Sequence, residues 1–75
     1  MRMSEFERAV EDEFGAAEGR TLLRDLVLDG LGDRTGRQAL AAGAEPREVW
    51  LALCRQTGVP ESRRHGVGRP EPRRR

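Results

Sequence analysis

The chain has 75 residues, of which 36% are hydrophobic and 36% charged, and its 14 basic and 13 acidic residues leave a net charge of +1. A chain of this length forms at most one small domain, and the little room it leaves for an enclosed ligand cavity disfavours an enzyme acting on a small molecule. No apolar run approaches the roughly 20 residues that cross a bilayer, and one cysteine cannot form a disulfide within a monomer. We therefore expect a cytoplasmic protein without a membrane-spanning segment.

The charges are unevenly distributed along the chain. Residues 1–60 contain 11 acids and 8 arginines, a net charge of −3, whereas residues 61–75 contain 6 arginines and 2 glutamates, a net charge of +4. Residues 61–75 are also rich in glycine and proline and poor in large apolar side chains, so burial cannot offset their chain entropy. We expect residues 1–60 to form the domain and residues 61–75 to form a disordered tail.

The first predicted helix starts near the N-terminus. Ser4 and Glu7 have the spacing of a capping box, which predicts that the helix begins at Glu5. Gly15 is suited to end it. Between these limits, apolar side chains recur at every fourth position: Phe6, Val10 and Phe14.

The second predicted helix has a clear end and two alternative starts. It begins at Ala16, or at Thr21 after a turn at Gly19. The glycines at 30 and 32 end it. Its apolar stripe consists of Leu22, Leu23, Leu26 and Val27, widened by Leu28 and Leu31.

The third and fourth predicted helices have stronger boundary signals. Thr35 and Gln38 form a second capping box, which predicts a short helix that Gly43 ends. The fourth helix spans Pro46–Gln56, because proline suits the first helical position and Gly58 tolerates the left-handed conformation just past the end.

These patterns predict the fold class. No alternation typical of strands occurs, so we expect an all-α fold, a compact bundle of about four short helices spanning residues 4–60. Trp50 has the largest apolar side chain, and the other helices are expected to pack around it. The predicted core consists of Phe6, Phe14, Leu23, Leu26, Val27, Val49, Trp50 and Leu53.

The sequence offers no constellation of residues for catalysis. Cys54 lies on the apolar stripe of the fourth helix, and the single histidine, His65, lies in the predicted tail, so no oriented Cys–His pair and no zinc site is expected. We expect no catalytic residue, metal or cofactor. The leading hypothesis is a protein-interaction or regulatory module that acts by binding, with a partner surface formed by Arg47, Glu48 and Leu51. Leu51 faces away from the stripe of Trp50, Leu53 and Cys54, and we expect it to be the exposed apolar anchor of this surface.

The alternative hypothesis is nucleic-acid binding. Residues 36–57 combine a short helix, a turn with glycine and a longer helix, the outline of a helix-turn-helix. Glu45 and Glu48 disfavour this interpretation, because they place negative charge at the start of the would-be recognition helix, where phosphates would lie. In this alternative the phosphate contacts come from the predicted tail, through Arg63, Arg64, Arg69, Arg73, Arg74 and Arg75.

A spaced set of residues resembles a known family. The set consists of Met1-Arg2, Glu5-Phe6, Phe14-Gly15, Arg24-Asp25, Leu28, Arg34-Thr35, Ala39-Leu40, Gly43, Val49-Trp50, Cys54 and Pro60. It is similar to short actinobacterial proteins classed as a domain of unknown function, and the resemblance covers residues 1 to about 64. It implies no activity, because none is established for that family.

Overall fold

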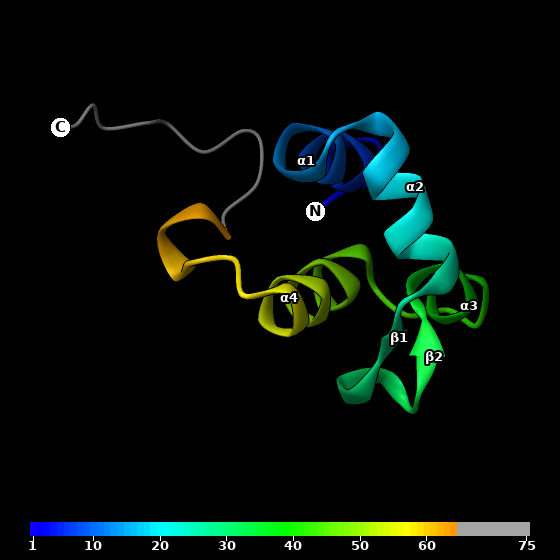
Figure 1. The fold of residues 1–75 in the computed structure, drawn as a ribbon. Helices are drawn as coiled ribbons and strands as arrows, with labels where there is room; N and C mark the ends of the chain where they lie inside the picture. The colour runs from blue at the N-terminus through cyan, green and yellow to red at the C-terminus, as the bar shows by residue number, and fades with distance from the viewer. Residues whose placement is uncertain (65–75) are drawn as a thin grey trace, which may run out of the picture.

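In the computed structural model residues 1–64 are described, and helix α4 (Pro46–Thr57) lies at their centre (Figure 1). Helices α1 (Met3–Phe14) and α3 (Gly36–Ala41) pack against it, and α2 (Ala16–Asp25) packs against both of these helices. The described residues also form strands β1 (Val27–Leu28) and β2 (Arg34–Thr35) and the 3-10 turns η1 (Asp29–Leu31) and η2 (Glu61–Arg63). This mostly helical architecture confirms the predicted bundle of four helices. No helix among residues 1–64 is long and apolar enough to cross a membrane.

Helix α1 begins two residues earlier than predicted. Its first residue is Met3, and the backbone N–H of Arg2 donates to Glu5 Oε1 at 2.8 Å. Glu5 thus accepts the hydrogen bond from the backbone N–H that precedes the helix, the role that the sequence pattern assigned to Glu7. The predicted end at Gly15 is confirmed, because Gly15 follows the last helical residue with φ 90°.

Helix α2 begins at Ala16, the earlier of the two predicted starts. Gly19 lies where α2 crosses α1, and a Cβ placed on it would come within 2.6 Å of Val10 Cγ1. The missing side chain therefore lets the two helices pack closely, and Gly19 does not form the turn considered in the sequence analysis.

The hairpin after α2 was not predicted. Val27 pairs with Thr35 and Leu28 with Arg34 in an antiparallel arrangement of two residues per strand. Successive side chains of a strand point to opposite faces, so Leu28 is fully buried while Val27 is 44% exposed. The prediction of Val27 as a core residue is therefore wrong, because the helix was expected to continue to the glycines at 30 and 32, whereas α2 ends at Asp25.

Helices α3 and α4 agree with their boundary signals. Thr35 Oγ1 accepts from the Gln38 N–H at 3.1 Å, and Gln38 Oε1 accepts from the Thr35 N–H at 3.0 Å, which confirms the capping box. Helix α4 begins at Pro46 and ends at Thr57, one residue past the predicted end, before Gly58 with φ 81°.

Helix α4 supplies the largest part of the core. Trp50 and Leu53 are at most 1% exposed, and Phe14 meets Trp50 edge-to-face with ring centroids 6.5 Å apart. Phe6 and Val49 are fully buried as predicted, whereas Phe14, Leu23 and Leu26 are partly buried against the core. The core also contains residues that the prediction left out: Ala9, Val10, Leu28, Ala39, Ala52, Cys54 and Val59.

The described fold continues four residues past the predicted domain boundary at residue 60. The turn η2 is joined to α1 by an ion pair between Arg63 and Glu13, and to α4 by a hydrogen bond from the Trp50 indole to the Arg64 carbonyl. Residues 61–64 were assigned to the tail because they lack large apolar side chains, but polar contacts hold them in place. The predicted disorder of residues 65–75 lies outside the described residues.

Candidate functional site

An open groove of about 520 Å³ lies between α1, α2 and α3. It is lined by Met3, Glu7, Val10, Glu11, Gly15, Ala16, Gly19, Arg20, Leu23, Arg37 and Leu40. The groove is open to solvent. It was not predicted, because the short chain was expected only to lack an enclosed cavity.

Two of the lining residues on α2 are small. Ala16 and Gly19 lie three positions apart on the face of α2 that borders the groove, with Leu23 four positions further. Val10 Cγ1 occupies the space beside Gly19, so Gly19 brings α1 and α2 together, whereas Ala16 is exposed and lines the groove. Neither residue was expected to border a groove.

The floor of the groove is apolar and is held firmly by the fold. Val10 is buried, and Leu23 and Leu40 are partly buried against the core. At the start of α3, a Cβ on Gly36 would come within 2.7 Å of Leu23 Cδ2, so α3 lies directly against α2. Met3, which is 43% exposed, adds apolar surface on the α1 side.

The two sides of the groove carry opposite charges. Glu7 and Glu11 project from α1, whereas Arg20 of α2 and Arg37 of α3 line the groove from the other helices. All four residues are exposed, and among residues 1–64 none of them takes part in an ion pair. The groove therefore offers apolar contact with separate acidic and basic edges.

The predicted partner surface lies on α4, outside this groove. Arg47 and Glu48 are exposed, but Glu48 Oε1 accepts from the backbone N–H of Glu45 at 3.3 Å and so caps its own helix. Leu51 is partly buried and packs against the core, so it is not the freely exposed anchor that the helical pattern predicted. The sequence pattern placed Leu51 off the main stripe, but α4 is central and is covered on more than one side.

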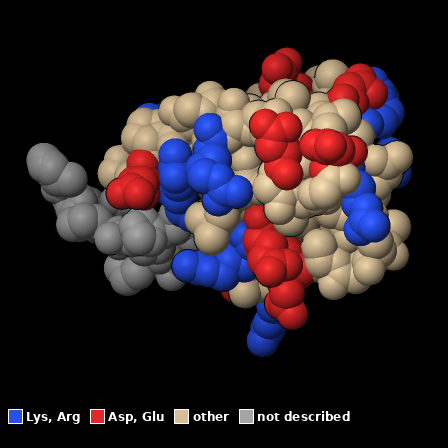
Figure 2. Space-filling view, turned by 90° about the horizontal axis from the view of Figure 1, so that it is seen from below, with Lys and Arg blue, Asp and Glu red and all other residues tan. Residues whose placement is uncertain are grey.

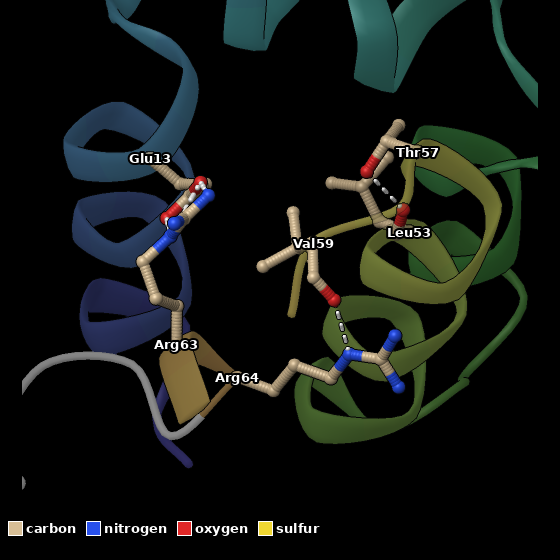
Figure 3. A network of polar contacts seen from close by, with 6 residues as sticks. All are labelled: Glu13, Leu53, Thr57, Val59, Arg63 and Arg64. Atoms are coloured by element: carbon tan, nitrogen blue, oxygen red, sulfur yellow. Dashed lines mark hydrogen bonds and ion pairs between the residues drawn. The ribbon is translucent and has the colours of Figure 1, made fainter. Parts of the chain in front are cut away.

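Two of the predicted phosphate contacts are held by the chain itself (Figure 3). Arg63 Nη2 lies 2.9 Å from Glu13 Oε2, and the Arg63 Nε also donates to this carboxylate. Arg64 Nε donates to the carbonyl of Val59 at 2.7 Å. The other predicted contacts, Arg69, Arg73, Arg74 and Arg75, lie outside the described residues.

The predicted helix-turn-helix outline exists, but its second helix is largely enclosed. Helix α4 follows α3 after a turn in which Gly43 has φ 103°. Gln56 of α4 is bound to the hairpin, because its Nε2 donates to the Val27 carbonyl at 2.7 Å and its Oε1 accepts from the Asp29 N–H at 3.2 Å. Figure 2 shows the underside of the view in Figure 1, where acidic and basic side chains are interspersed and no broad basic patch forms.

Cys54 is buried in the core beneath the C-terminal turn. Burial raises the pKa of its thiol to about 11, so the group is protonated at neutral pH. Its place in the core agrees with the predicted structural role. Among the described residues, no group of three or more potential metal ligands occurs.

Comparison with known proteins places the chain in one family. Residues 1–62 match the family described as "Protein of unknown function (DUF3046)". The chain belongs to this family. No curated protein and no solved structure matches the chain significantly. The matched part of the DUF3046 domain contains every residue that lines the groove.

Proposed function

We propose that this DUF3046 protein is a binding module that recognises another protein through the groove between α1, α2 and α3. The observation that carries the proposal is the apolar floor between separate acidic and basic edges. Protein recognition sites combine an apolar centre with a polar rim, and complementary charges at the rim set the orientation of the partner.

The distribution of polar groups favours a protein partner over a small molecule. Small-molecule sites bury most of their ligand and direct a few fixed polar groups into the pocket. The ionic groups of this groove, by contrast, are on exposed side chains at its edges, and its floor is formed by Val10, Leu23 and Leu40. We therefore propose binding without catalysis.

The groove is a stronger candidate than the α4 surface of Arg47, Glu48 and Leu51. Met3 and Val27 are the most exposed large apolar side chains among residues 1–64, and Met3 belongs to the groove. Leu51, in contrast, uses part of its surface against the core. The α4 surface is the rival site, and the capture experiment below distinguishes the two.

Affinity capture with charge-reversed variants tests the proposal. Three baits are used in a lysate of the source organism: the parent chain, R20E/R37E and R34E/R47E. The proteins bound to each bait are quantified by mass spectrometry. The two double variants change the net charge equally, and all four arginines are exposed. We expect a partner that R34E/R47E retains and R20E/R37E loses. Equal recovery by all three baits, or loss with R34E/R47E alone, would reject the groove.

Nucleic-acid binding, the alternative from the sequence, has no comparable support. Arg63 and Arg64 are engaged within the chain, and Arg47 lies between Glu45 and Glu48 at the start of α4. Affinity for nucleic acid depends mainly on cations that are free to neutralise phosphates. We therefore rank this function below protein binding.

A further inference from the structure

We infer that the groove binds one amphipathic helix of a partner protein, with an acidic edge facing Arg20 and Arg37 and a basic edge facing Glu7 and Glu11. This inference rests on the proposed function and specifies the class of partner. It depends on three features of the groove: the secondary structure of its walls, the spacing of its lining residues and the arrangement of its charges.

The walls favour a helix over an extended peptide. Apart from Gly15, every lining residue belongs to α1, α2 or α3, so helices and not strand edges form the walls of the groove. An extended peptide needs a free strand edge for its backbone hydrogen bonds, and no strand lines the groove. A helix pairs its backbone N–H and C=O groups within itself, so it can bind through side-chain contacts alone.

The spacing of the lining residues matches helix packing. On α1 the groove is lined at positions 3, 7, 10 and 11, and on α2 at positions 16, 19, 20 and 23. The α2 set has the spacing i, i+3, i+4, i+7 and the α1 set has the related spacing i, i+4, i+7, i+8, so each set lies along one helix face, as do the ridges against which another helix packs. The lined stretch of each helix is about 11–12 Å long at 1.5 Å per residue, so a partner helix of about three turns would cover it.

The charges orient this helix. With the apolar stripe of the partner on Val10, Leu23 and Leu40, its two flanking edges meet Glu7 and Glu11 on one side and Arg20 and Arg37 on the other. Turning this helix end for end would exchange its two edges and place like charges together on both sides, which is unfavourable. The charges therefore set the direction in which the bound helix runs.

A peptide-display selection on the full chain tests the inference. The library presents 16-residue helices with leucine at i, i+3 or i+4, and i+7, and with Glu or Lys varied independently on each edge. We expect enrichment of peptides with one glutamate edge and one lysine edge. Affinity of an enriched peptide should fall about tenfold with R20E/R37E, as expected for the loss of two rim pairs, and stay unchanged with R34E/R47E.

A charge exchange makes the test specific. The variant E7R/E11R/R20E/R37E should bind the enriched peptide in the opposite direction, which a spin label at one end of the peptide reports by broadening opposite ends of the groove in the two 15N-labelled proteins. Amide shifts should map the peptide to the groove in both proteins. Failure to enrich any peptide, equal binding by R20E/R37E, or shifts confined to other surfaces would overturn the inference. If lysate capture still depends on Arg20 and Arg37, the proposed function survives that failure.

Self-association is the competing occupant, and sedimentation analysis distinguishes it. We expect the parent chain to remain a monomer across the concentrations used for peptide binding. A dimer that R20E/R37E dissociates and R34E/R47E retains would assign the groove to a second copy of the chain and would overturn the inference.

Discussion

The indole N–H of Trp50 donates to the backbone carbonyl of Arg64, 14 residues further along the chain. This bond joins the centre of the core to the end of the described structure. A buried indole N–H needs an acceptor, and the turn η2 brings one to it. The core thus depends on residues that follow the last large apolar side chain of the domain, Val59.

Replacing Trp50 with alanine should remove most of the stability of the domain. Truncating a buried tryptophan costs about 3–5 kcal/mol, comparable to the whole free energy of unfolding of a small domain. Thermal unfolding followed by circular dichroism measures the loss. The control W50F keeps an aromatic ring against Phe14 but leaves the Arg64 carbonyl without its donor, and it should cost less than W50A. A W50A variant that melts like the parent would place Trp50 outside the core.

Gly19→Ala should destabilise the domain although alanine favours helices. A methyl group at residue 19 would lie 2.6 Å from Val10 Cγ1, and such overpacking costs about 1–3 kcal/mol, against a gain of about 1 kcal/mol in helix propensity. The matched control is Gly30→Ala, whose new methyl group would meet the end of the flexible Arg55 side chain. Urea denaturation compares the two variants. Greater stability of G19A would contradict the close crossing of α1 and α2.

The free energy of unfolding should fall between pH 9 and pH 11. Burial raises the pKa of Cys54 from its ordinary 9.0 to about 11, so the unfolded chain loses the thiol proton before the folded chain does. The contribution of the protonated thiol to the free energy of unfolding is therefore fully present below pH 9 and is lost as the pH rises. The loss is roughly 2 kcal/mol at pH 11.

The composition makes this pH dependence unusually easy to assign. The sequence contains no lysine and no tyrosine, so Cys54 is the one side chain whose ordinary pKa lies between 8 and 12. Urea denaturation at several pH values measures the slope, with Cys54→Ala as the control. An equal slope in C54A would show that the thiol does not cause it.

Any binding to DNA should disappear when the chain ends at Arg64. Arg63 and Arg64 are held by Glu13 and Val59, so four of the six predicted phosphate contacts remain, the arginines beyond residue 64. Four contacts give a log–log slope of affinity against salt of about −3 to −4 on duplex DNA. Fluorescence anisotropy from 50 to 200 mM salt measures it. Binding that survives truncation would favour the segment 36–57 as a DNA-binding motif.

Local signals in the sequence predicted the helix boundaries well where one residue fixes the backbone. Thr35 has a side-chain oxygen that caps α3, and Pro46 and Gly58 restrict or permit the φ values at the ends of α4. The start of α1 was mispredicted because Ser4–Glu7 and Arg2–Glu5 have the same spacing, and only the structure shows which glutamate reaches back to the helix start.

The hairpin and the groove could not be predicted from periodicity. Strands of two residues are too short to show alternation, so Val27 and Leu28 continued the helical stripe of α2. Periodicity shows which side of a helix is apolar, but it does not show how deeply a neighbouring helix fills that side. The groove depends on how α1, α2 and α3 pack together, which the sequence of any one helix does not show.

The bond between Trp50 and Arg64 also gives the molecule an intrinsic spectroscopic probe. Trp50 is the single tryptophan of the sequence, and its indole contacts both Phe14 of α1 and the C-terminal turn. Its fluorescence therefore reports on the docking of η2 as well as on the core. Undocking of this turn would expose the indole N–H to water and shift its emission to longer wavelength while the helices stay folded, so fluorescence and circular dichroism would separate the two events without any label.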